Sequence, residues 1–260
     1  MTQMRAPRSA FLLAIVGVLA WQGALAGDIG LTPPRLEIVV PAGGSVTESV
    51  SLATTAADAQ QVRVSLSDWT LAPTGEVVYF AEGSLPTSAA AWIEPEASDV
   101  LVAPGGEQAF RLTVSVPDDA TLNGTYQAMV MFQVVPRSLP DDGIATTTRI
   151  ALTVYVTVAG TERDVVELVD FYDEDGALTI AIANDGNTVQ RLGGQLEIRD
   201  ATGTAVASVA VPNVPVLRDS ERWLRLTLPP ALPAGFYVVL ALVEPSRGGL
   251  LAGELPLTLP

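Results

Sequence analysis

Apolar and polar residues alternate with a period of two along most of the chain. Clear runs are 45–53 (SVTESVSLA), 61–69 (QVRVSLSDW), 110–116 (FRLTVSV) and 150–158 (IALTVYVTV). Such alternation sends successive side chains to opposite faces of a β-strand. Clusters of Gly, Pro and Asp, such as 73–75 (PTG), separate the runs and favour turns. No stretch after residue 26 has a sustained helical period, so the pattern predicts an all-β protein.

An internal echo divides the chain into two parts. The segments 111–113 (RLT) and 124–126 (GTY) reappear as 225–227 (RLT) and 235–237 (GFY). In immunoglobulin-like folds a tyrosine at such a place forms a corner between the sheets. We therefore predict two immunoglobulin-like β-sandwich domains in tandem, over residues 27–159 and 165–260, with 160–164 as the linker. Two unrelated surface turns are the alternative explanation of the echo.

The amino-terminal segment has the features of a cleavable signal peptide. Basic Arg5 and Arg8 precede an apolar run over 11–21, and the small-residue site 24–26 (ALA) follows it. The apolar run is well short of the roughly 20 residues that a helix needs to cross a bilayer. We predict that residues 1–26 are removed, that the protein is exported, and that the mature chain does not insert into a membrane.

Charge and composition restrict the chemistry. The net charge is −15, every basic residue is an arginine, and the chain contains neither cysteine nor histidine. Disulfides and thiolate metal sites are excluded, as are mechanisms that use histidine as a general base. Such an acidic field repels nucleic acid and anionic lipid, although a bias toward solubility explains the charge equally well. No cofactor is expected.

Two acidic clusters suggest chemistry, and each has a simpler explanation. Asp170 with 173–175 (DED) offers several carboxylates to Ca²⁺, but an acidic stretch that ends in Gly is also a common turn. Glu94 and Glu96 beside Trp92 suggest the paired acids of a glycosidase. Residues two apart on a strand share a face, so a solvated sheet edge explains this pair better.

The order of several short segments resembles a known family. Arg35 follows two prolines at the start of the first strand, where an arginine is suited to hold a partner's carboxylate or is an ordinary solvent-facing residue of a sheet edge. The segments 67–69 (SDW), 88–93 (SAAAWI), 101–105 (LVAPG) and 110–114 (FRLTV) follow it. Together they resemble the amino-terminal domain of PapD-like periplasmic pilus-assembly chaperones, over about residues 28–158.

The resemblance implies a periplasmic chaperone without catalytic activity. Its cleft would hold a pilin-like or other secreted β-rich subunit, whose sheet is completed by a strand of the chaperone. Arg35 would anchor the subunit's terminal carboxylate together with a basic residue of the last strand, for which Arg149 is the candidate. Ile150 and Leu152 would contact the partner, or would face the core of their own domain. The oligomeric state is left open.

A second interpretation is a protein of the cell envelope. The same order of short segments followed by a second sandwich is also similar to two-domain cell-surface proteins of Gram-positive bacteria that bind wall polymer or partner proteins. This resemblance implies an adhesion or scaffold protein built of two immunoglobulin-like modules. Such a protein would self-associate stably or bind polymer, in place of a transient client.

Overall fold

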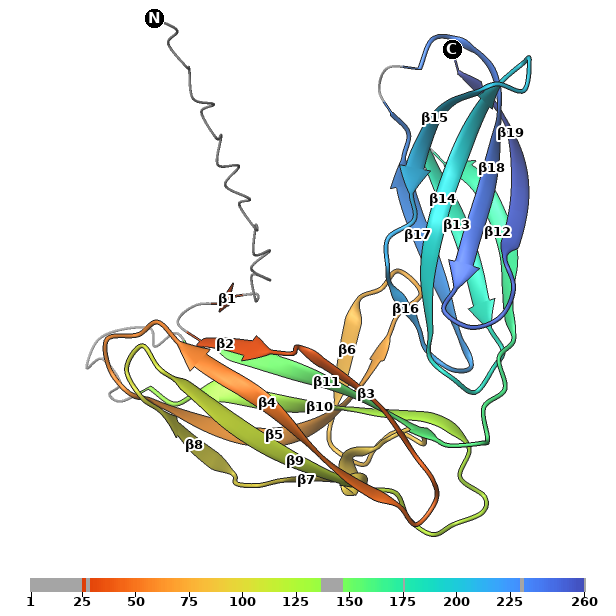
Figure 1. Cartoon of the computed structure of the whole chain (residues 1–260). Coiled ribbons are helices and arrows are strands. Elements are labelled where there is room, and N and C mark those ends of the chain that lie inside the picture. Colours follow the sequence, from red (N-terminus) through yellow and green to blue (C-terminus); the bar gives the residue numbers. More distant parts are fainter. Residues whose placement is uncertain (1–24, 27–28, 137–146, 175, 230–231, 260) are drawn as a thin grey trace, which may run out of the picture.

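The computed structural model describes residues 25–26, 29–136, 147–174, 176–229 and 232–259. Its strands form two β-sandwiches that meet at an elbow (Figure 1). The strands of the first sandwich are β1 (Leu25–Ala26), β2 (Ile29–Thr32), β3 (Arg35–Val40), β4 (Ser45–Thr54), β5 (Gln60–Leu71), β6 (Val77–Phe80), β7 (Ile93–Pro95), β8 (Asp99–Val102), β9 (Glu107–Ser115), β10 (Gly124–Val134) and β11 (Arg149–Val158). A short 3-10 helix, η1 (Ala90–Trp92), precedes β7.

The second sandwich follows after a few residues without regular structure. Its strands are β12 (Val166–Glu174), β13 (Ala177–Asn184), β14 (Gln190–Asp200), β15 (Ala205–Ala210), β16 (Pro215–Val216), β17 (Ser220–Thr227), β18 (Gly235–Pro245) and β19 (Leu251–Leu259). One sheet has the order β12-β13-β17, and the other has the order β15-β14-β18-β19 with β16 also on β14. Strand β13 is the central strand of its sheet and is buried along its whole length.

In the first sandwich, one sheet has the order β1-β2-β4-β9-β7 and the other β3-β11-β10-β5-β6. The segment β2–β3 belongs to both sheets. β2 pairs antiparallel with β4, whereas β3 pairs parallel with β11. Pro33 and Pro34 separate the two strands, and proline has no N–H to donate to a ladder. The prolines therefore mark the point at which the chain crosses from one sheet to the other.

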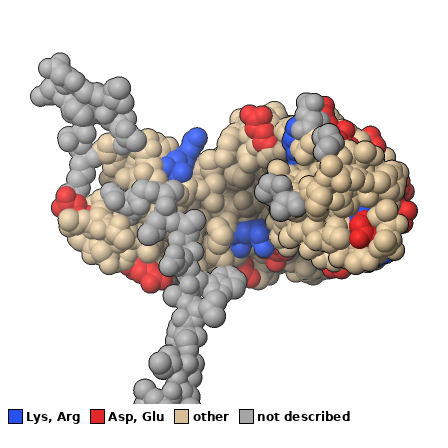
Figure 2. Space-filling view, turned by 90° about the horizontal axis from the view of Figure 1, so that it is seen from above, with Lys and Arg blue, Asp and Glu red and all other residues tan. Residues whose placement is uncertain are grey.

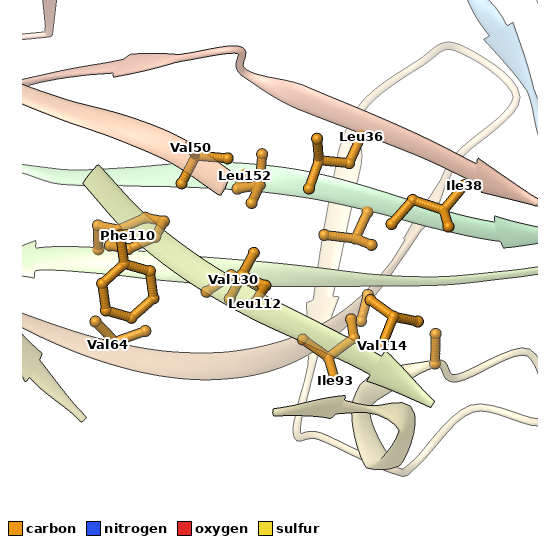
Figure 3. Packing of buried hydrophobic residues seen from close by; sticks show 14 of the residues in the cluster. Leu36, Ile38, Val50, Val64, Ile93, Phe110, Leu112, Val114, Val130 and Leu152 are labelled. Carbon is orange, nitrogen blue, oxygen red and sulfur yellow. The ribbon is translucent and has the colours of Figure 1, made fainter. Parts of the chain in front are cut away.

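Alternating apolar side chains from both sheets fill the first core (Figure 3). Phe110 of β9 and Phe132 of β10 are almost completely buried, and their ring centroids lie 5.4 Å apart at an edge-to-face angle of 89°. Leu152 of β11 is also fully buried in this core. The period-two pattern of the sequence therefore corresponds to inward and outward faces, as the burial of β3 shows most regularly.

The two echoed tyrosines have different environments. The Tyr237 hydroxyl donates to the Pro233 carbonyl oxygen at 2.8 Å, which is the predicted tyrosine corner. Tyr126 instead packs on Trp92, with 4.4 Å between ring centroids. The echo thus marks a corner in the second sandwich and an aromatic contact in the first.

The predicted all-β class with two sandwiches is confirmed. The exact boundaries at 159–160 and 164–165 stay a prediction. Nearly all of the predicted signal peptide, residues 1–24, lies outside the described residues, as does most of the polar connection between β10 and β11. Within the part of the chain that the structure describes, no helix has the length and apolar character needed to cross a bilayer.

Candidate functional site

Among the described strands, the first part of β11 has a hydrogen-bonded neighbour on one side only. Residues from Arg149 to Leu152 pair with β10, but pairing with β3 begins at Thr153, opposite Arg35. The Thr153 N–H donates to the Pro34 carbonyl oxygen at 3.2 Å, so odd-numbered residues direct their backbone groups to this side. No other described strand pairs with this side of Arg149–Leu152. An edge of this kind can accept an added strand.

The predicted site residues occupy two faces of β11 and β3. Arg149 is exposed at the beginning of β11, on the same face as Arg35 at the beginning of β3. Thr153, opposite Arg35, lies four positions after Arg149, which is roughly 13 Å along a strand. Arg35 forms an ion pair with Glu37, whose Oε1 lies 2.8 Å from the Arg35 Nε. The structure therefore does not bring Arg35 and Arg149 together.

The two apolar residues of the prediction face inward. Ile150 is half-buried and packs against the first core, and Leu152 is completely buried within it. Of the two alternatives that the sequence left open, the core of the same domain holds for Leu152. The physical reason is the period of two, since Leu152 shares its face with the buried Val154 and Val156.

A residue of the second sandwich completes the charged cluster, and sequence reasoning missed it. Arg191 of β14 places its Nε 2.7 Å from the same Glu37 oxygen. Its side chain is only 13% exposed, and its guanidinium carbon lies 5.7 Å from the centre of the Tyr155 ring. Arg191 lies 154 residues from Glu37 in the sequence, so no local motif could have indicated the contact.

The Arg191 guanidinium packs on the ring of Tyr155. Tyr155 as a whole is 3% exposed, and burial raises the pKa of its hydroxyl to about 12, although the nearby arginines oppose the shift. The phenol is therefore neutral at physiological pH, and its ring face attracts the guanidinium as a cation–π pair. This contact holds Arg191 in place while its neighbours Arg35 and Glu37 remain about half exposed.

A cavity of about 250 Å³ lies at this point between the sandwiches. Its lining includes Glu37 and Tyr155 from the first sandwich, with Thr188, Arg191 and Arg247 from the second. Figure 2 shows basic side chains in the hollow between the two lobes, in a molecule that is otherwise rich in acidic groups. This cavity and the neighbouring edge of β11 form the candidate site, which we name the interdomain cleft.

An apolar contact fixes the second sandwich against the first. Leu217 is 2% exposed and packs on the outer face of the first sandwich, among Trp69, Met129, Met131 and Tyr155. Burying large apolar side chains of this kind supplies most of the stability of an interface. This contact places β14, and with it Arg191, over Glu37.

A polar junction lies beside the apolar contact. The Thr125 N–H donates to the Asn187 carbonyl oxygen at 2.8 Å, and the Asn187 side-chain amide donates to Asn123 and Thr161. Gly124 has a φ of +69°, and a Cβ there would lie 2.0 Å from the Asn187 carbonyl oxygen. Only glycine is compatible with so close an approach between the sandwiches.

The hairpin between β5 and β6 reaches across to the second sandwich as well. The Trp223 N–H of β17 donates to the Pro73 carbonyl oxygen at 2.8 Å, and Arg222 Nη1 donates to the same oxygen at 3.2 Å. Gly75 has a φ of +94°, and a Cβ there would meet the Arg222 guanidinium. The hairpin therefore covers part of the outer edge of β17, which among the described strands pairs with β13 alone.

The described residues of the acidic clusters make contacts that a structural role explains. Glu96 Oε1 accepts the Arg111 backbone N–H at 3.0 Å, and Oε2 lies 2.9 Å from Arg111 Nη2. This fits the solvated edge better than a pair of catalytic acids. Among the described residues, no group of carboxylates is arranged to hold a metal ion, and Asp175 of the proposed calcium loop lies outside them.

Comparison with known proteins relates the fold to a group of solved structures. No family model and no curated protein sequence matches the chain. The crystal structure of the YadV chaperone matches at a TM-score of 0.51, with 12% identity, over 89% of this chain and 100% of that chain. The class 5 fimbriae chaperone CfaA matches at 0.50, with 13% identity, over 90% and 100%. The chain has the two-domain fold of the fimbrial chaperones.

The fimbrial chaperone fold extends over both sandwiches, since each match covers about nine-tenths of the chain. The predicted resemblance to PapD-like chaperones is thus confirmed as a fold, and it includes the second domain, where the sequence offered only a sandwich of suitable length. The interdomain cleft lies at the elbow of this fold.

Proposed function

We propose that this protein is a non-enzymatic periplasmic pilus-assembly chaperone, which binds pilin-like subunits by strand addition along Arg149–Leu152. The observation that carries the proposal is the unpaired side of β11 at the interdomain cleft, in a chain with the fold of fimbrial chaperones. An added strand would form backbone hydrogen bonds with the odd-numbered residues of this edge, and these bonds would supply affinity.

The position of β3 supports a role for the end of the partner chain. A strand added along Arg149–Leu152 would lie in the same row of the sheet as β3, which begins at Arg35. A partner strand that runs parallel to β11 would therefore have its carboxyl end at Arg35. A free terminal carboxylate fits this place, because β3 leaves no room for the chain to continue in the sheet.

The other predicted residues have smaller parts in the proposal. Arg149 lies on the outer face at the far end of the edge and would attract acidic groups of the partner. The exposed part of Ile150 would contact the partner's apolar groove. We do not assign a contact to Leu152, because it is buried in the core. The lack of histidine and the predicted signal peptide agree with a binding protein that works after export.

Site-specific photo-crosslinking in the periplasm tests the proposal. A photoreactive phenylalanine at position 151 would lie on the open edge, and the same residue at position 101 would lie on β8, where Leu101 is 65% exposed. We expect position 151, and not position 101, to crosslink to a small secreted β-rich subunit, with the products identified by mass spectrometry. The Arg35→Ala variant should weaken this crosslink, whereas Arg63→Ala, which removes an exposed arginine of the same sheet, should not.

Crosslinking at positions 151 and 101 also distinguishes the chaperone hypothesis from the hypothesis of an envelope scaffold. If both positions capture the same partners, or if position 151 captures only further copies of this chain, the edge is an ordinary surface or an assembly contact. A scaffold of immunoglobulin-like modules would then explain the fold better than a chaperone. Equal crosslinking of the wild type and Arg35→Ala would mean that Arg35 does not anchor the partner. Strand addition along Arg149–Leu152 would still be supported.

A further inference from the structure

Two arginines from different domains converge on one carboxylate oxygen in the interdomain cleft. Glu37 Oε1 lies 2.8 Å from the Arg35 Nε and 2.7 Å from the Arg191 Nε. Two positive charges thus surround one negative charge, and the cluster has a net charge of one positive unit in an otherwise acidic protein. A guanidinium has five N–H donors in a planar fork, which suits it to carboxylates.

The three side chains differ in how firmly they are held. Arg191 is largely buried on the ring of Tyr155, whereas Arg35 and Glu37 are 44% and 51% exposed. Ion pairs of half-exposed side chains contribute little to stability, because water solvates each partner nearly as well. Glu37 can therefore leave the arginines at low cost, while Arg191 stays where the interface holds it.

The cluster adjoins the place where a partner's chain end would lie. Arg35 is opposite Thr153, the first residue of β11 beyond the open edge. Glu37 follows on the same face of β3, opposite Tyr155, and all three of Glu37, Tyr155 and Arg191 line the cavity of about 250 Å³. A carboxylate that reaches Arg35 along this edge thus meets Glu37 already bound between the arginines.

We propose that Glu37 is an internal carboxylate which occupies this site in the free protein, and that Arg191 of the second domain is the site's second cation. A partner's terminal carboxylate binds by displacing Glu37 from between Arg35 and Arg191. This inference rests on the proposed function, because the carboxylate is that of the added strand. If the inference holds, binding of the partner's terminal carboxylate requires both domains in the observed arrangement. Glu37 weakens this binding because it competes for the two arginines.

A pair of peptides tests this mechanism on the full mature protein. The probes are a short peptide of alternating valine and threonine with a free carboxyl end, and the same peptide with an amidated end. We expect the wild type to bind the acid more tightly than the amide. Glu37→Gln should strengthen binding of the acid on the order of tenfold and leave the amide unchanged, because the competing charge is gone. Arg191→Gln should remove the preference for the acid.

The second domain offers a matched control on the same strand. Arg199 and Glu197 of β14 also form an ion pair, at 2.8 Å, outside the residues that line the cleft. Arg199→Gln and Glu197→Gln should behave as the wild type with both peptides. An acid that binds Glu37→Gln no more tightly than wild type would overturn the displacement of Glu37. An undiminished preference for the acid in Arg191→Gln would overturn the role of Arg191.

A titration with acetate keeps the two proposals distinguishable. In Glu37→Gln, sodium acetate should shift the NMR signals of the Arg35 and Arg191 Nε–H groups more than in the wild type, and more than sodium chloride at equal ionic strength. If neither peptide binds to any variant, the proposal of strand addition is contradicted. The acetate shifts then show whether Arg35 and Arg191 bind a carboxylate independently of strand addition. The absence of both effects would overturn the site together with the proposed function.

Discussion

The two halves of β11 belong to one strand and have different surroundings. Residues from Thr153 to Val158 have β3 on one side and β10 on the other, and Tyr155 in this half is covered by the second domain. Within the described part of the chain, residues from Arg149 to Leu152 pair with β10 alone. Both halves direct their even-numbered side chains into the same core. The difference shows that a strand can bury the side chains of one face in its own domain while the backbone groups along one edge stay available for pairing with another chain.

Among the predicted effects, the largest change in the free energy of unfolding should come from a substitution on the inward face of Arg149–Leu152. Leu152→Ala removes a fully buried side chain, and we expect the free energy of unfolding to fall by about 2–5 kcal/mol. Chemical denaturation measures this change. Thr153→Ala, on the outer face of the same strand, is the control and should cost far less. A loss below about 1 kcal/mol for Leu152→Ala would mean that its face is not part of the core.

The half of β11 that the second domain covers should make the stability of the protein depend on alkaline pH. Burial raises the pKa of Tyr155 to about 12, against about 10 in an unfolded chain. The resulting stability is fully present below pH 10 and is lost as the pH rises through 12, by up to about 2–3 kcal/mol. Denaturation at a series of pH values measures the loss. Tyrosine ionisation can be followed by absorbance, and because the chain has no lysine, no lysine side chain titrates in the same pH range and changes the stability there.

Two tyrosine variants check the assignment of this alkaline transition. Tyr155→Phe should flatten the dependence on pH between 10 and 12. Tyr79→Phe is the matched control, since Tyr79 is 52% exposed. An unchanged alkaline transition in Tyr155→Phe would contradict the assignment.

Hydrogen exchange compares the two halves without any substitution. The Thr153 N–H donates to Pro34, whereas the Ala151 N–H points to the same side ahead of β3. We expect the Ala151 amide to exchange at least about tenfold faster than the Thr153 amide in the free protein. Binding of a partner strand should slow exchange at Ala151. Equal protection of both amides in the free protein would show that another segment covers the edge.

The smallest effect on stability is expected at the open edge itself. Ala151→Pro removes one N–H that points away from β10, and proline is tolerated on such edges. Its cost should stay below about 1 kcal/mol in denaturation, while crosslinking of a partner at a neighbouring position should be lost. The control is Leu152→Pro, which removes a ladder bond to β10 and should unfold the domain.

The period-two pattern was sufficient for much of the fold and not for the site. It predicted the strands around 45–53, 61–69, 110–116 and 150–158, and the structure has β4, β5, β9 and β11 there. For Ile150 and Leu152 the pattern defined a shared face but could not say whether a core or a partner covers it. That depends on the opposite sheet, which the sequence of β11 does not contain.

The charged cluster shows where sequence reasoning ends. Arg35 could be selected from its place after two prolines, but Arg149 was chosen only because it is the basic residue of its strand. The partner of Glu37 from the second domain is Arg191, and this contact depends on the docking of Leu217 and Asn187 against the first domain. Docking between domains is set by surface complementarity over many residues, and no short motif encodes it. The turn at 73–75 was likewise predicted as a turn, without its contact to β17.

The hairpin over β17 has a consequence for solubility. An uncovered strand edge with apolar side chains is a site of aggregation, and β17 carries Trp223, which is 43% exposed. The Pro73 carbonyl and the backbone of Gly75 occupy part of this edge in the intact chain. The first domain precedes the second in the chain, so the hairpin that covers β17 is synthesised before β17 itself. The same domain produced alone would present β17 to other copies and would be expected to precipitate.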